Sequence, residues 1–266
     1  MSTNKLIFRI SAYGLLVLLF VFSVGFASHK QSQMVCSGIR INIIDSVVAG
    51  FITKSDLLQT INNKFGAMEG QAINSINMSL LEKIINTNPF IYDAEVFSTV
   101  DGKLNIDVKQ RFPILRVINF KSESFYIDKE GVFMPQSEKF TARVPVANGF
   151  IFDREAAKRV LTSDISIYDS LPSKTKLSQL LNIVHYTSKS ELWSAVVQQF
   201  FVNDDGDIEL IPRVGNHTVV LGSDQFLDEK FNKLFHFYKE GLNKKGWDKY
   251  KVVNLKIKNQ VVCIKK

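Results

Sequence analysis

The chain has 266 residues, of which 45% are hydrophobic and 22% are charged, and its formal net charge is +7. This balance is typical of a folded protein and excludes an intrinsically disordered chain. The lysines and arginines are scattered, and no basic run with interleaved aromatic residues stands out. The positive charge therefore favours membrane proximity over nucleic-acid binding. The length suits one large domain or two small ones.

An uncharged apolar segment covers residues 10–27. Its length is close to the roughly 20 residues that a helix needs to cross a hydrocarbon core. Lys5 and Arg9 precede it, which favours an N-terminus on the cytoplasmic side. The sequence therefore predicts a short cytoplasmic tail (residues 1–9), one transmembrane helix (residues 10–27) and export of the rest of the chain. A cleaved signal peptide is the alternative, since small residues around Ala27 offer a candidate cleavage site.

Residues 37–112 predict a small α+β domain. An alternating strand is followed by a helix that Thr53 caps, with Asp56 as the acid of a capping box. The remaining expected elements are a helix from Ser79 to Asn88, a strand over 91–100, a turn at Asp101-Gly102 and a strand over 103–110. This βααββ order resembles a POTRA domain, a small module found next to membranes in export and division proteins.

After Pro113 the sequence predicts a β-rich domain with flanking helices over residues 113–266, so the fold class of the exported part is α+β. Pro145 predicts either an edge strand or the start of a strand at residues 144–146. Helices are expected over 173–188 and 225–242. Other strands are expected over 114–120, 125–133 with a tight turn at 128–131, 195–202, 208–212, 218–222 and 252–264.

Sequence motifs for catalysis or metal binding are missing. No two of the four histidines have metal-ligand spacing; they are His29, His185, His217 and His236. Residues 204–207 resemble the start of a calcium loop, but Gly215 occupies its twelfth position, so a hairpin turn is the better interpretation. His217 follows a turn and is predicted to be solvated. The sequence predicts no enzyme, no cofactor, no metal site and no small-molecule substrate.

The two cysteines, Cys36 and Cys263, belong to no C-x-x-C pair. This excludes the usual zinc spacings and a disulfide-dense scaffold. Two free thiols are one reading. A bridge between them is the other, if the domain faces an oxidising compartment, because sequence alone does not show whether the two positions meet.

Several short motifs follow one another behind the single anchor: residues 125–131 (FYIDKEG), 144–149 (VPVANG), 208–215 (IELIPRVG) with 220–222 (VLG), and 253–260 (VNLKIKNQ). In this order the chain resembles the FtsQ/DivIB family of bacterial cell-division proteins over almost its full length. The resemblance implies a non-enzymatic divisome subunit in the cytoplasmic membrane. Its periplasmic part would hold the small bitopic proteins FtsB and FtsL at the division site.

In that family the partner pairs with the terminal strand. A late strand with an unpaired edge accepts another chain by β-augmentation. The residues predicted to bind the partner are Leu255, Lys256, Ile257, Lys258, Asn259, Gln260 and Val261. Lys256 and Lys258 suit an acidic partner segment. Ile257 stands where the family often has an aromatic residue, so the side-chain details do not carry over. An ordinary strand with a solvated lysine face is the alternative.

Two other classes of protein compete with this interpretation. A POTRA-bearing factor for export or outer-membrane assembly is the first, but such proteins usually carry several POTRA modules and this chain predicts one. A cell-wall hydrolase or transferase is the second, and the missing catalytic motifs disfavour it.

Overall fold

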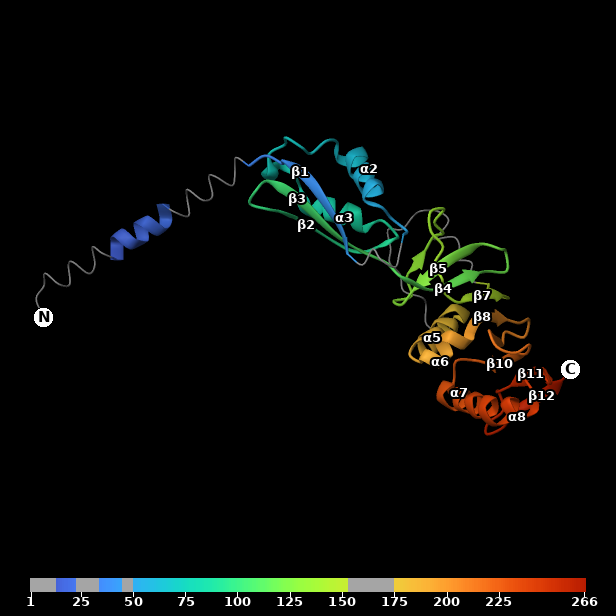
Figure 1. Ribbon diagram of the computed structural model, residues 1–266. Coiled ribbons are helices and arrows are strands. Elements are labelled where there is room, and N and C mark those ends of the chain that lie inside the picture. The colour runs from blue at the N-terminus through green and yellow to red at the C-terminus, as the bar shows by residue number, and fades with distance from the viewer. Residues whose placement is uncertain (1–12, 23–33, 45–49, 153–174) are drawn as a thin grey trace, which may run out of the picture. The chain divides into compact units, whose positions relative to one another are not determined.

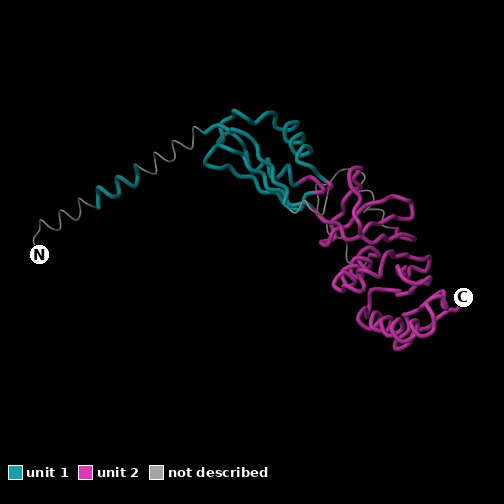
Figure 2. Tube along the Cα trace, in the orientation of Figure 1, with its two compact units in different colours: residues 1–46, 52–86, 91–110 teal, residues 47–51, 87–90, 111–266 magenta. Residues whose placement is uncertain are grey.

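The structure is a computed structural model and describes residues 13–22, 34–44, 50–152 and 175–266 (Figure 1). It divides into two compact units: unit 1 has residues 1–46, 52–86 and 91–110, and unit 2 has residues 47–51, 87–90 and 111–266 (Figure 2).

A helix with exposed side chains covers residues 13–22. Within the described ranges, no helix combines the length and the hydropathy that crossing a membrane requires. The other residues of the predicted span lie outside the described ranges, as does the predicted tail, so both stay predictions.

Unit 1 has the predicted order of strand, helix, helix, strand, strand. Its elements are β1 (Gly38–Ile44), α2 (Lys54–Phe65), the short 3-10 turn Ile73–Ser75, α3 (Met78–Asn86), β2 (Ile91–Ser98) and β3 (Lys103–Gln110). The sheet order is β1-β3-β2, with β1 parallel and β2 antiparallel to β3. The helices bury their apolar faces against the sheet, because Leu57, Leu81 and Ile106 belong to one hydrophobic core.

Local sequence signals explain where these elements begin and end. Thr53 accepts a hydrogen bond from the Asp56 N–H, and the Asp56 carboxylate accepts one from the Thr53 N–H, so the predicted capping box is confirmed. The predicted start of the second helix was slightly wrong. The Leu80 N–H donates to Asn77 Oδ1 at 2.9 Å, so Asn77 caps α3 and not Ser79.

Unit 2 is built on one mixed sheet with the strand order β12-β11-β10-β9-β8-β7-β4-β5-β6. Its first strands are β4 (Pro113–Ile118), β5 (Ser124–Asp128), β6 (Phe133–Met134) and β7 (Val146–Gly149). After the gap in the described residues come α5 (Lys176–Ser188), α6 (Glu191–Val196), β8 (Val197–Val202), β9 (Ile208–Pro212), β10 (Thr218–Gly222), α7 (Leu227–His236), the π-helix Phe237–Leu242, α8 (Asn243–Lys245), β11 (Tyr250–Asn254) and β12 (Val262–Lys265). The fold is α+β, as predicted.

The strand after Pro145 lies inside the sheet. β7 is parallel to both of its neighbours, β4 and β8. The edge-strand reading of residues 144–146 was therefore wrong, and the alternative, a strand that starts at the proline, is correct. Proline is tolerated there because β7 begins at Val146, after the residue that lacks an N–H donor.

The predicted last strand, residues 252–264, was also wrong as a single element. β11 and β12 are two antiparallel strands joined by residues 255–261. Asn259 has φ 57°, in the left-handed region that asparagine adopts more readily than most residues, and the Gln260 N–H donates to the Ile257 carbonyl. Apolar residues alternate at Val253, Leu255 and Ile257, so the sequence pattern predicted a continuous strand and no turn.

Gly149 allows β7 and β8 to end side by side. Its φ is 99°, and a Cβ atom there would lie 2.2 Å from the Val202 carbonyl oxygen. We expect Gly149→Ala to lower the free energy of unfolding by about 2–3 kcal/mol, from backbone strain and the clash together. Urea denaturation followed by tryptophan fluorescence measures this, since Trp193 and Trp247 both belong to unit 2.

Gly246→Ala is the matched control for Gly149→Ala. Gly246 has a similar φ of 94°, but nothing lies within 4 Å of the added Cβ. The decrease in the free energy of unfolding of Gly246→Ala should therefore come from backbone strain alone. Equal losses for the two variants would show that the contact with Val202 carries no cost.

Candidate functional site: the open edge of the large sheet

β12 is the outermost strand of the large sheet, and the described part of the chain places no strand on its outer side. On its inner side it is antiparallel to β11, with Val253 opposite Cys263 and Asn254 opposite Val262. The Lys266 N–H donates to the Lys249 carbonyl at 3.3 Å. N–H groups alternate in direction along an antiparallel strand, so those of Cys263 and Lys265 face outward. We call this edge of β12 the open edge.

The side chains of β12 also suit a partner strand. Val262 and Ile264 share one face of the strand and are 42% and 58% exposed. Cys263, between them, packs against the main core of unit 2. The open edge therefore combines outward main-chain groups with a narrow apolar surface.

The seven residues predicted to bind the partner form the connection between β11 and β12, not a strand. Two of them are held inside: Leu255 is fully buried and donates its N–H to the Val220 carbonyl, and Val261 packs against the core. Lys256 is exposed, but it forms an ion pair with Asp207. The others are exposed: Ile257, Lys258, Asn259 and Gln260. The structure thus brings the predicted residues together beside β12, but leaves only some of them accessible.

Two side chains of α7 hold this connection in place. Lys233 Nζ donates to the carbonyls of Leu255 (3.1 Å) and Ile257 (2.7 Å). Glu229 accepts the Asn259 N–H at 3.2 Å and lies 3.5 Å from Lys233 Nζ. The Asn259 N–H and then Lys233 lower the pKa of Glu229. The sequence did not predict these contacts. A glutamate and a lysine four residues apart, such as Glu229 and Lys233, indicate only an ion pair on the surface of a helix.

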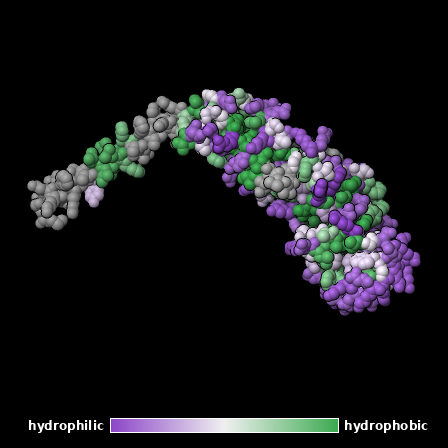
Figure 3. Space-filling model, in the orientation of Figure 1, coloured by the Kyte–Doolittle hydropathy of each residue, from purple (hydrophilic) through white to green (hydrophobic). Residues whose placement is uncertain are grey.

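The lysines are less scattered than we inferred from the sequence, because positive charge gathers around the open edge. Nine lysines and two acidic residues lie in residues 239–266, a net +7 that equals the formal charge of the whole chain. In Figure 3 the end of unit 2 that carries these residues is strongly hydrophilic. Lys249, Lys251 and Lys265 are exposed and stand on the paired strands or directly beside them. The surroundings of β12 therefore favour an acidic partner.

His217 corrects a prediction of the sequence. It is buried and not solvated, with 6% of its surface exposed. Its Nε2 lies 2.9 Å from the Tyr238 hydroxyl, and its ring also contacts Trp247. The Nδ1 atom is buried without a hydrogen-bond partner. Burial, and then the charge of Lys266, lower the pKa of His217, and burial raises the pKa of Tyr238.

We expect His217 to make unit 2 less stable in mild acid. The folded pKa lies below the ordinary 6.5, so the unfolded chain binds more protons as the pH falls below that value. Stability is therefore fully present above about pH 6.5 and declines as the pH falls through the folded pKa. Urea denaturation at pH 7, 6 and 5 measures the slope. His217→Gln, which can still reach Tyr238, should flatten it, and an unchanged slope would assign the acid sensitivity to other groups.

Neither cysteine is bridged in the structure. Cys36 is a buried free thiol of unit 1, and Cys263 is a half-buried free thiol of unit 2, where burial raises its pKa. Among the described residues, no group of three or more histidine, cysteine or acidic side chains is placed to hold a metal ion. Residues 204–207 form the predicted hairpin turn, with the Gly206 N–H donating to the Asn203 carbonyl. His29 lies outside the described residues.

Comparison with protein families divides the chain in two. Residues 112–264 match the family model described as FtsQ/DivIB, C-terminal related. Residues 34–109 match the model of the POTRA-like domain. No curated protein matches the chain.

Proposed function

Because the chain belongs to the FtsQ/DivIB family, we propose that it is a non-enzymatic divisome subunit that holds small bitopic division proteins at the septum. The partners would be similar to FtsB and FtsL. The observation that carries this proposal is the open edge of β12, an edge strand of the large sheet whose first three residues belong to the family-matched range. A protein that organises partners needs such a surface.

The partner would add an extended segment to the sheet. Outward N–H and carbonyl groups of Cys263 and Lys265 would pair with its main chain, which supplies affinity. Val262 and Ile264 would contact its apolar side chains, and the surrounding lysines would select acidic ones. Of the residues predicted from the sequence, Ile257 and Lys258 are exposed and would flank this strand. Leu255, Lys256 and Val261 would position the connection.

The location of the protein is part of the proposal. Residues 10–27 would anchor it in the cytoplasmic membrane with residues 1–9 inside, and both units would be periplasmic. The uncharged length of this segment and the preceding Lys5 and Arg9 support this topology. Alkaline extraction of membranes tests the anchor, since an integral protein stays in the pellet. Release of the intact chain into the supernatant would contradict it.

Depletion of the protein tests the cellular role. We expect long filaments with blocked septa, because the divisome would lose the subunit that assembles its bitopic members. The membrane profile of the same cells should keep its outer-membrane proteins. Normal septation together with loss of outer-membrane proteins would instead support a POTRA-bearing assembly factor and overturn the proposal.

A further inference from the structure

A second surface of unit 2 lies where three parallel strands end. β4, β7 and β8 are parallel neighbours, so their carboxyl ends meet at one edge of the sheet. In open sheets with parallel strands, ligands bind outside these ends. Here the residues that follow the strands are Phe120 after β4, Phe150 and Phe152 after β7, and the turn 203–206 after β8. This surface is separate from the open edge of β12.

The three phenylalanines form an exposed aromatic group. The ring centroids of Phe120 and Phe150 are 5.4 Å apart, and those of Phe120 and Phe152 are 5.1 Å apart. Phe152 is 68% exposed and Phe120 57% exposed. Aromatic side chains are usually buried, and such a group on the surface of a folded domain marks a binding surface more often than an isolated exposed residue does.

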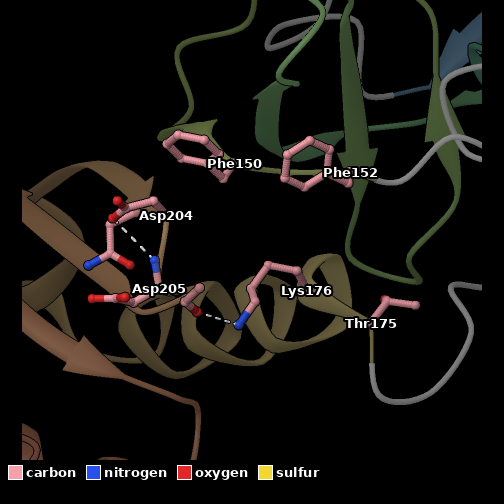
Figure 4. A pocket seen from close by; sticks show the side chains of 8 residues that line it. Phe150, Phe152, Thr175, Lys176, Asp204 and Asp205 are labelled. Atoms are coloured by element: carbon pink, nitrogen blue, oxygen red, sulfur yellow. Dashed lines mark hydrogen bonds between the residues drawn. The ribbon is translucent and has the colours of Figure 1, made fainter.

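A recess of about 440 Å³ lies beside this group. Figure 4 shows Phe150 and Phe152 on one side and Asp204, Asp205 and Lys176 on the other. We call it the aromatic recess. The backbone that shapes it is fixed, since the Phe150 N–H donates to the Val202 carbonyl at 2.8 Å. Its volume suits one or two side chains of a partner and is small for a folded element.

The polar side chains of the recess differ in the hydrogen bonds and ion pairs that they already form within the protein. Lys176 Nζ donates to the Gly206 carbonyl (2.6 Å) and to Gln179 Oε1 (2.9 Å), so it caps the turn. Asn203 is bound to Glu209 at 3.0 Å. Asp204 Oδ1 accepts the Asp205 N–H at 3.2 Å, and within the described part of the chain the carboxylates of Asp204 and Asp205 form no ion pair. The recess therefore offers ring faces and two carboxylates.

We propose that the aromatic recess binds an arginine or lysine side chain from an extended segment of a partner protein. The apolar stem and the cationic head would lie on the faces of Phe150 and Phe152, where the ring quadrupole attracts a cation. The carboxylates of Asp204 and Asp205 would accept charge-assisted hydrogen bonds from the head group. The same carboxylates would repel an anionic membrane surface, which disfavours insertion of the phenylalanines into lipid.

Peptide binding to the full chain in detergent micelles tests this proposal. The probe is a fluorescein-labelled Gly-Ser peptide with two arginines, and the matched peptide has citrulline in their place. We expect the arginine peptide to bind, and Phe152→Ser to weaken it about fivefold, as the loss of one cation–π contact predicts. Asp204→Asn with Asp205→Asn should weaken it about tenfold, since both carboxylates are exposed and water screens the ion pairs that they would form.

Two control variants make the result specific. Phe226→Ser removes an exposed phenylalanine elsewhere in unit 2 and should leave binding unchanged. Lys265→Pro, at the open edge, should also leave it unchanged, which separates this site from the proposed division function. Equal binding of the arginine and citrulline peptides, or equal loss in Phe226→Ser, would overturn the proposal. Binding of phosphatidylglycerol vesicles that depends on Phe152 would overturn it in favour of a membrane contact.

Discussion

Asp128→Asn is expected to lower the free energy of unfolding of unit 2 by about 3–5 kcal/mol, the usual cost of removing one partner from a buried ion pair. Asp128 pairs with Arg111, and their side chains are 1% and 5% exposed. Asparagine keeps an acceptor for the N–H groups of Glu130 and Val132, which Asp128 binds at 2.9 Å and 2.7 Å. The loss would therefore report the ion pair between the Asp128 carboxylate and the Arg111 guanidinium. Urea denaturation with tryptophan fluorescence measures it.

An exposed pair of the same unit is the control for this variant. Asp248 lies 3.7 Å from Lys266, and its side chain is 84% exposed. Water screens such a pair, so Asp248→Asn should cost less than about 1 kcal/mol. The double variant Arg111→Met with Asp128→Asn should be more stable than Asp128→Asn alone, since it removes the guanidinium that has lost Asp128 and keeps the acceptor for the N–H groups of Glu130 and Val132. Similar losses for Asp128→Asn and Asp248→Asn would contradict a structural role of the buried pair.

Lys265→Pro is expected to abolish co-purification of the proposed bitopic partners from crosslinked membranes. Proline has no N–H group, and the Lys265 N–H faces outward, where an added strand would need it. β12 should stay paired with β11, because edge strands tolerate proline on the outward side. Circular dichroism and the unfolding midpoint of the variant check that unit 2 remains folded.

Lys265→Ala separates main-chain pairing from charge in this experiment. It removes the same ammonium group but keeps the N–H donor, so it should weaken the complex without abolishing it. One rim charge contributes modestly, and its effect should shrink at high salt. Unchanged co-purification of Lys265→Pro would exclude strand addition at the open edge. Complete loss in Lys265→Ala would make charge, and not main-chain pairing, the main contribution.

Local signals in the sequence were enough to predict most of the elements. The capping box at Thr53, the turn at Asp101-Gly102 and the hairpin turn at residues 204–207 need only neighbouring residues, so they could be recognised without a structure. The alternating and helical patterns likewise predicted the βααββ order of unit 1. The family resemblance rested on motifs of the same local kind, and the match to residues 112–264 confirms it.

The candidate site was predicted less well, for a physical reason. The apolar alternation at Val253, Leu255 and Ile257 predicts a strand, but the chain turns there because Lys233 and Glu229 bind the carbonyls and the N–H of the connection. These partners lie more than twenty residues away in the sequence. No pattern within residues 252–264 reveals them, so the open edge lies at residues 262–265, directly after the seven residues that the sequence suggested.

The sequence by itself determined the α+β class, most element boundaries and the family, because these depend on short-range periodicity, caps and turns. Only the tertiary structure decided which residues meet. It buried His217 against Tyr238, paired Arg111 with Asp128, put β7 inside the sheet and gathered three phenylalanines at the ends of parallel strands. Each depends on contacts between distant residues, and β12 became an open edge for the same reason: strand order is a property of the whole sheet.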